Sequence, residues 1–139
     1  MLYETDFYAW TNQQALLLRT GNFVDADMDN IAEEIQSMGR RERRELVSRL
    51  KILLVHLLKW QYQPAFRGRS WELTIKEQRK ELELHLLDNP SLKSGLHQSL
   101  ADAYALAVIR AENETGLESF PEICPYGFDE VMAEEFWPE

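Results

Sequence analysis

The stretch RERRELVSRLKILLVHLLKWQYQP, residues 41–64, decides the fold class of this chain. Its apolar residues recur at the spacing of one face of an α-helix. Pro64 cannot continue such a helix, because proline lacks the amide hydrogen and its ring clashes with the preceding turn. The stretch therefore predicts a long helix from about Arg40 to Gln63. The apolar stripe on its inner face consists of Leu46, Leu50, Leu53, Leu57 and Trp60, with Leu54 beside it.

Two further helices are predicted before this stretch. Small polar residues that accept hydrogen bonds from free amides are common at helix N-termini, and glycine is common just beyond the C-terminus. On this pattern the first helix ends at Gly21 and the second at Gly39. The candidate N-caps are Thr5 or Asp6 for the first helix and Asp25 or Asp27 for the second.

Two more long helices are predicted after the stretch. Ser70 is a good N-cap for a fourth helix that reaches about Leu87. Asn89 followed by Pro90 fits the start of a fifth helix, since proline is favoured at the first helical position. Gly116 is expected to end this fifth helix.

The remaining tail, from residue 117 to residue 139, is rich in proline and aromatic residues. It is expected to end in a short helix with Asp129 as its cap. No segment alternates apolar and polar residues in the way a strand does. We therefore predict an all-α fold: a single-domain bundle over residues 1–139, with four to five main helices, a Pro/aromatic-rich C-terminal tail and a short terminal helix.

Composition excludes several classes of protein. The apolar fraction of 45% and the charged fraction of 28% are typical of globular rather than disordered chains. A single cysteine, Cys124, allows no intramolecular disulfide. The first ten residues carry acids where a signal peptide needs bases and an apolar run. No apolar segment approaches the roughly 20 residues that span a bilayer. We expect a soluble cytoplasmic protein with no membrane partner.

The net charge of −9 is distributed unevenly along the chain. Residues 1–38 carry seven acids and one base, and residues 81–139 carry thirteen acids and two bases. The segment 39–80 between them carries twelve bases and four acids, a net charge of +8. An acidic protein with a basic central segment either neutralises that segment internally or presents it to a partner.

A series of motifs follows in order along the chain: YETDFYAW, ALLLRTG, NIAEEIQSMGRRERREL, LLVHLLKWQYQP, RSWELTIKEQR, NPSL, ETGL, FPEICPY and EFWPE. In this order they resemble the bacterial family called domain of unknown function 29. The resemblance covers the chain from its first ten residues to its last five. It implies a nearly all-helical bacterial protein, and it brings no activity or catalytic residues with it.

The connection between the third and fourth predicted helices is a candidate anion site. Free amides at the start of a helix attract phosphate, and arginine binds phosphate through two parallel hydrogen bonds. Nearby aromatic residues would stack on bases if the ligand were a nucleotide or a single strand. The candidate residues for phosphate or single-stranded nucleic acid are Lys59, Arg67, Arg69 and Lys76.

A second set of polar residues is predicted on or beside the inner helix faces. One interpretation is structural: the set forms a buried, hydrogen-bonded network, in which Glu34 and Arg79 are one possible pair. The residues of this network are Glu34, Arg49, Gln78 and Arg79. As a catalytic feature it is an acid–base group of Glu34, His56 and His85, with one histidine as the base and Glu34 as its orienter.

No metal site and no cofactor are predicted. The three histidines, His56, His85 and His97, lack both the spacing of the zinc protease motif and the Glu-x-x-His pairs of di-iron bundles.

Three functions remain open at this point. The first is an interaction or regulatory module that binds a protein partner or a second copy of itself. The second is the binding of phosphate or single-stranded nucleic acid through residues 39–80. The third is a small hydrolase-like enzyme. We favour the first, because the sequence assembles no complete catalytic set.

Overall fold

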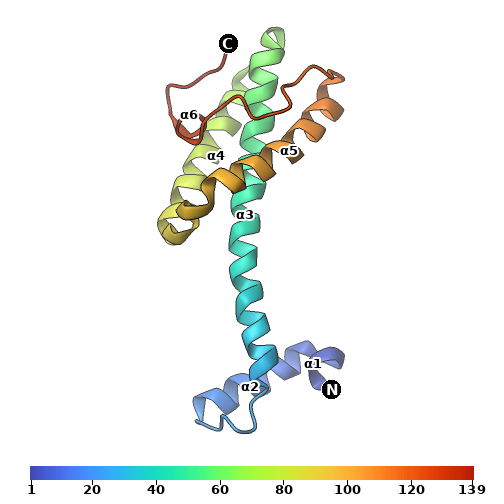
Figure 1. The fold of residues 1–139 in the computed structure, drawn as a ribbon, viewed down its shortest axis with the longest axis vertical. Helices are drawn as coiled ribbons and strands as arrows, with labels where there is room; N and C mark the ends of the chain where they lie inside the picture. The colour runs from blue at the N-terminus through green and yellow to red at the C-terminus, as the bar shows by residue number, and fades with distance from the viewer. The chain divides into compact units, whose positions relative to one another are not determined.

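The computed structural model describes residues 1–139, and it contains helices and no strands (Figure 1). The prediction of an all-α fold is confirmed. There are six α-helices, of which four are long, and two short 3-10 helices. Their bounds are α1 (Leu2–Thr5), α2 (Phe7–Arg19), α3 (Met28–Tyr62), η1 (Pro64–Phe66), α4 (Arg69–Asp88), η2 (Pro90–Gly95), α5 (Leu96–Thr115) and α6 (Phe128–Met132).

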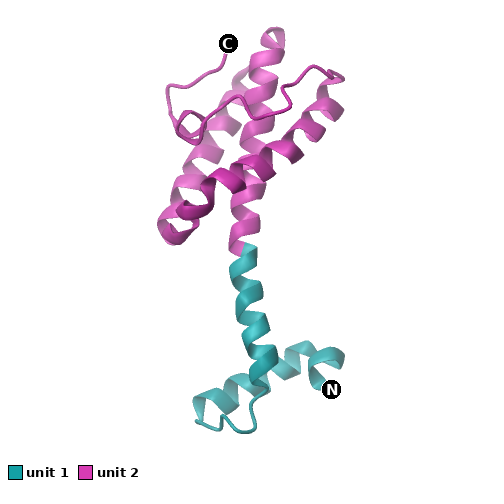
Figure 2. Ribbon diagram, in the orientation of Figure 1, with its two compact units in different colours: residues 1–41 teal, residues 42–139 magenta.

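The chain divides into two compact units, residues 1–41 and residues 42–139 (Figure 2). The first unit holds α1, α2 and the part of α3 up to Arg41. The second unit holds the rest of α3 and all later elements. We describe each unit separately, and the prediction of one domain over residues 1–139 stays a prediction.

In the first unit, polar side chains organise the turn between α2 and α3. Asp6 is the N-cap of α2 and accepts a hydrogen bond from the Ala9 amide at 3.1 Å, which confirms one of the two predicted caps. The indole of Trp10 is buried and donates to the Asp27 carboxylate at 3.1 Å. The Asp27 amide in turn donates to the side chain of Gln14 at 2.7 Å. These bonds hold the start of α3 against α2.

The prediction that a helix ends at Gly39 is wrong. The second and third predicted helices form one helix, α3, and Gly39 lies inside it. A glycine in a helix interior costs only about 1 kcal/mol relative to alanine. The neighbouring arginine, glutamate and leucine residues are good helix formers, so this cost does not interrupt the helix. In contrast, Gly21 has a φ of +75° just beyond α2, the left-handed conformation that favours glycine.

The core of the second unit is built on the leucine stripe of α3, as the sequence predicts. Leu46, Leu50, Leu53 and Leu57 are fully buried. They share one cluster with residues of α4, of α5 and of the tail, among them Ile75, Leu82, Ala103, Ala107, Ala111, Tyr126 and Val131. The small alanines let α5 approach its neighbours closely. In Figure 1 the tail after α5 runs across the helices of this unit.

The ends of α3 and α4 differ slightly from the prediction. Helix α3 ends at Tyr62, and Pro64 opens a 3-10 turn instead. Helix α4 begins at Arg69, so Ser70 lies in its first turn and is not the N-cap. Gly68 takes that position with an extended backbone and no side-chain bond. Glycine is acceptable there because it leaves the free amides accessible to water.

The start of α5 is later than predicted. Pro90 begins a 3-10 segment, and α5 itself begins at Leu96. Its end is as predicted, since Gly116 has a φ of +74°. The terminal helix α6 is confirmed, but its N-cap is Gly127 rather than Asp129. The Glu130 carboxylate accepts a hydrogen bond from the Gly127 amide at 3.0 Å, which is one half of a capping box.

Candidate functional site

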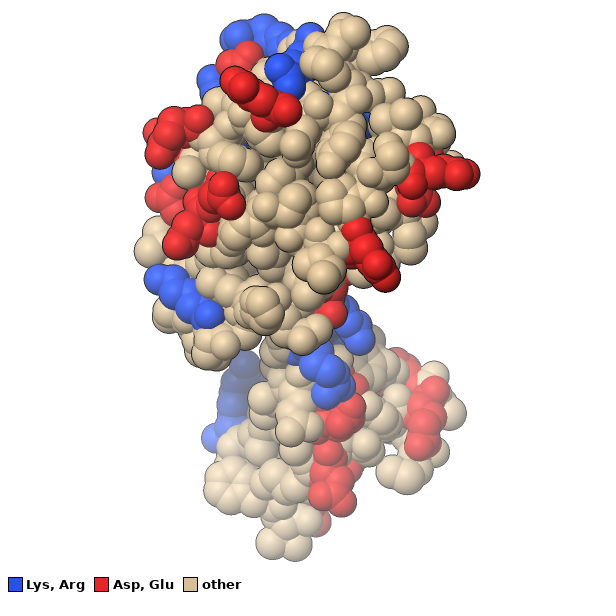
Figure 3. Space-filling model, turned by 45° about the horizontal axis from the view of Figure 1, so that its top comes forward, with Lys and Arg blue, Asp and Glu red and all other residues tan.

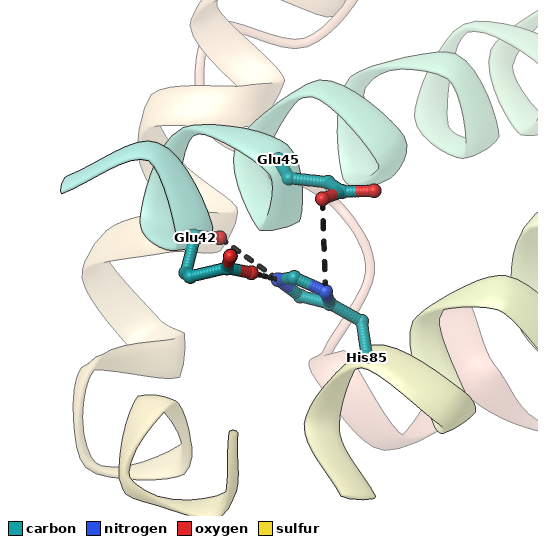
Figure 4. Close-up of side chains that lie close together, drawn as sticks. All are labelled: Glu42, Glu45 and His85. Carbon is teal, nitrogen blue, oxygen red and sulfur yellow. Dashed lines mark hydrogen bonds and ion pairs between the residues drawn. The ribbon is translucent and has the colours of Figure 1, made fainter. Parts of the chain in front are cut away.

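His85 lies in the last turn of α4 and faces α3 (Figure 4). Only 9% of this residue is exposed. Its Nε2 atom is 2.8 Å from the main-chain carbonyl oxygen of Glu42. A carbonyl can only accept a hydrogen bond, so Nε2 carries the proton and donates it. In the neutral ring the other nitrogen, Nδ1, then holds a free lone pair.

Two carboxylates of α3 lie beside the imidazole, one near each ring nitrogen (Figure 4). Glu42 Oε2 is 3.6 Å from Nε2, and Glu45 Oε2 is 3.9 Å from Nδ1. The potential ligand atoms of these three residues all lie within 4.8 Å of one another. The second oxygen of Glu45 is held by Arg49, whose Nη2 lies 3.0 Å away. We call Glu42, Glu45 and His85 the His85 cluster.

The His85 cluster borders an open hollow of about 480 Å³. The hollow is strongly acidic, with Arg49 as its only cationic side chain. Its lining residues are Glu42, Glu45, Arg49, Glu81, Leu84, His85, Asp88 and Asn89. Four carboxylates around one histidine and one arginine produce a local excess of negative charge.

The other two catalytic candidates do not join this cluster. Glu34 belongs to the first unit and accepts a hydrogen bond from the Tyr3 hydroxyl at 2.5 Å. That bond, more than burial, raises the pKa of Tyr3 to about 12. The Nδ1 atom of His56 is 2.8 Å from the Ile52 carbonyl of its own helix. Burial lowers the pKa of His56, so this ring is neutral at pH 7.

Two of the four predicted anion ligands already have partners within the chain. The Lys59 ammonium donates to Glu114 at 3.1 Å and lies over the Trp71 ring, 4.9 Å from its centre. The Arg67 guanidinium donates to the Trp60 carbonyl at 2.7 Å. It also lies over the Trp60 ring, 5.2 Å from its centre. These contacts link α3 to α5 and to the turn before α4.

The other two predicted ligands are exposed on the first turns of α4. Lys76 pairs with Glu72 at 3.0 Å, one helical turn earlier. Arg69 makes no ion pair and no side-chain hydrogen bond. Of the four candidates, Arg69 alone has a charged group that is free to meet an external anion. The structure therefore does not assemble the ring of cations that the sequence suggested.

A larger groove of about 950 Å³ lies beside Trp60 and Trp137. The two indoles pack with ring centres 4.8 Å apart. The groove walls carry acids and bases together, among them Glu72, Lys76, Arg79, Lys80, Glu83, Glu134 and Glu135. This mixture favours neither an anion nor a cation as a ligand.

Six of the twelve basic residues in segment 39–80 are paired with acids of the same chain. Arg43 pairs with Asp102 at 2.7 Å, and this bond holds the pKa of the Asp102 carboxyl below its usual range. Further pairs are Arg40 with Glu33, Arg49 with Glu45, Lys59 with Glu114, Lys76 with Glu72 and Lys80 with Glu83. On the face of the second unit in Figure 3, basic and acidic side chains surround an uncharged centre and form no continuous basic patch.

The predicted polar network is present only in part. Arg49 donates to Gln78 at 3.5 Å, and Gln78 is buried. Arg79 is also buried, but Glu34 is not its partner. Its guanidinium donates to three carbonyls of the tail, those of Val131 at 2.8 Å, Glu134 at 3.4 Å and Phe136 at 2.7 Å. Arg79 thus pins the tail to α4, a role that its sequence position does not reveal.

The first unit exposes most of its apolar side chains. Trp10 is its only buried hydrophobic residue. On α3, Ile35 and Met38 are 58% and 53% exposed. We call the exposed apolar residues of this unit the N-terminal apolar surface: Leu2, Phe7, Tyr8, Leu16, Leu18, Phe23, Val24, Met28, Ile35 and Met38.

Sequence reasoning missed Glu42 and Glu45 as neighbours of His85. The two glutamates have i, i+3 spacing, which puts both on one face of α3 and was a detectable signal. Their proximity to His85 was not detectable, because it depends on how α4 packs against α3.

The fold is that of a small all-α protein. No helix of the structure is long and apolar enough to cross a membrane. The sequence model of the family described as Domain of unknown function DUF29 matches residues 2–137, nearly the whole chain. The chain belongs to this family, as its motifs indicated. No curated protein and no solved structure matches it.

Proposed function

We propose that this chain is a cytoplasmic interaction module that binds a second copy of itself through the N-terminal apolar surface. The observation that carries the proposal is the imbalance of burial in residues 1–41. One hydrophobic residue is buried there, whereas ten large hydrophobic residues are exposed in addition to Met1. Large contiguous apolar surfaces are uncommon on monomeric proteins, and they mark interaction sites.

The size of the first unit supports the same conclusion. Units of about 40 residues rarely bury enough surface to be stable, and many depend on oligomerisation. The bonds of Trp10, Gln14 and Asp27 fix the turn between α2 and α3, but they cover little apolar area. Covering Ile35 and Met38 by a second chain would supply the missing burial.

The pattern of α3 favours a second copy as the occupant. Met28, Ile31, Ile35 and Met38 follow the 3-4-3 spacing of a coiled-coil seam, which pairs readily with a seam of the same kind. Acids come first along this helix and bases follow. Two antiparallel copies would therefore place acidic segments opposite basic ones, with Asp29, Glu33 and Glu34 facing Arg40, Arg41 and Arg44.

The two alternative functions have less support. Phosphate or single-strand binding was expected to use Lys59 and Arg67, and both already bind groups within the chain. A hydrolase was expected to combine Glu34 with a histidine. Glu34 is instead bonded to Tyr3.

The test is the mass of the protein in solution, measured by light scattering after size exclusion at several protein concentrations. We expect a dimer for the wild type and a monomer for the double variant Ile35→Glu/Met38→Glu. The matched control is Ile109→Glu, which changes an equally exposed isoleucine (66%) on α5 and should remain dimeric. A wild type that is monomeric at every concentration, or a control that dissociates like the double variant, would overturn the proposal.

A further inference from the structure

We propose that the His85 cluster binds one divalent transition-metal ion of the zinc class. The site is separate from the N-terminal apolar surface, and the proposal does not depend on self-association. It combines one imidazole with two carboxylates, a donor set that suits zinc and similar ions.

The free nitrogen of His85 is the central observation. The bond from Nε2 to the Glu42 carbonyl fixes the tautomer and leaves Nδ1 with a lone pair. Nδ1 makes no hydrogen bond, although the residue is nine-tenths buried and borders the acidic hollow. Metal-binding histidines commonly donate their second ring nitrogen to a backbone carbonyl or carboxylate, which orients the ring. His85 already has this arrangement.

The carboxylate of Glu45 is positioned to act as a second ligand. Its Oε2 atom is 3.9 Å from Nδ1 and makes no hydrogen bond. Two ligands of one zinc ion, each about 2.0–2.1 Å from it, lie about 3.3–3.5 Å apart in a tetrahedral site. Glu45 is 45% exposed, so a small rotation of its side chain closes the difference. Arg49 holds the other oxygen at 3.0 Å and keeps Oε2 directed toward the ring.

Glu42 can supply a third ligand, and water would complete the coordination sphere. Its Oε2 atom lies 3.6 Å from Nε2, the other ring nitrogen, and its side chain is 47% exposed, so the carboxylate would have to turn toward the ion at Nδ1. The hollow has room for such waters, with a volume of about 480 Å³. Glu81 and Asp88 add negative charge around it, and only Arg49 offsets that charge. A divalent cation would reduce the repulsion among these acids.

The test is titration of the metal-free full-length protein with Zn²⁺ by calorimetry. We expect one saturable site per chain. The variant Glu42→Gln/Glu45→Gln should bind Zn²⁺ at least about 100-fold more weakly, since it removes two direct ligands. It replaces exposed side chains, so its fold should be retained. The matched control is Glu83→Gln on α4, an exposed acid outside the hollow, and its affinity should equal that of the wild type.

A second measurement addresses the role of His85 without relying on a substitution of this buried residue. The ¹⁵N chemical shifts of its imidazole should show Nε2 protonated before Zn²⁺ is added, and Nδ1 alone should shift on saturation. Absence of saturable binding would overturn the proposal, as would binding that Glu42→Gln/Glu45→Gln leaves intact. Unchanged His85 signals at saturating Zn²⁺ would also overturn it, because the ion would then lie elsewhere.

Discussion

Replacing Gly39 by alanine should stabilise the protein, and the sign of this effect tests the continuity of α3. Gly39 has a helical backbone, and a Cβ atom built on it meets no atom within 4 Å. The substitution therefore introduces no clash. What remains is the loss of backbone freedom in the unfolded chain together with the higher helix propensity of alanine. These effects are together worth about 0.5–1 kcal/mol.

The assay is urea unfolding followed by far-ultraviolet circular dichroism at one fixed protein concentration. With a slope of about 2 kcal/mol per molar urea, the gain would raise the midpoint by about 0.3–0.5 M. The matched control is Gly116→Ala at the end of α5, where φ is +74°. Alanine is strained in that conformation, so this variant should lose about 1–2 kcal/mol. If Gly39→Ala were destabilising to a similar extent, α3 would not be continuous through residue 39.

Two further predictions concern the tail. Arg79→Ala should lower the free energy of unfolding by about 3–5 kcal/mol, because three bonds from a charged donor are lost and the bond to the Val131 carbonyl is buried. As a control, Lys80→Ala at the exposed neighbouring position should change the free energy of unfolding by less than about 0.5 kcal/mol. A change as small as this for Arg79→Ala would contradict the role of Arg79 in holding the tail. Burial raises the pKa of Tyr104 to about 12. The folded state therefore holds the Tyr104 proton more tightly than the unfolded chain does. This difference contributes fully to the stability of the folded state below about pH 10, and the contribution decreases as the pH rises toward about 12. We would record phenolate absorbance directly after a pH jump for the wild type and for Tyr104→Phe. The two proteins should differ near pH 12, and a difference that appears near pH 10 would refute the raised pKa of Tyr104.

Local chemistry explains which parts of the fold were predictable. The leucine stripe of α3 identifies its own buried face, because the spacing alone places those residues together. Pro64 and Gly116 mark helix ends through their own backbone restrictions. Gly39 misled the prediction because glycine permits a helix end without requiring one. The deciding quantity was the sum of helix propensities over both flanking segments, and that sum favours continuation.

The sites were less predictable, because they depend on packing between distant segments. The basic segment was visible as a composition bias, but the sequence could not show that Lys59 would meet Glu114. Equally, nothing local marks the main-chain carbonyl of Glu42 as the partner of His85. The helical spacing of Ile35 and Met38 places both residues on one face of α3. Spacing predicts that a face will be covered, and it does not say whether the covering residues come from the same chain.

The bond pattern of the tail also has a consequence for synthesis of the protein. Side chains of earlier helices donate to its main chain, as Arg79 does to Phe136 and Tyr104 does to Pro121 at 2.5 Å. Val131 and Tyr126 complete the core itself. On the ribosome, α3, α4 and α5 emerge before these acceptors exist. The nascent second unit must therefore keep a guanidinium hydrated and part of its core open until the tail has been translated.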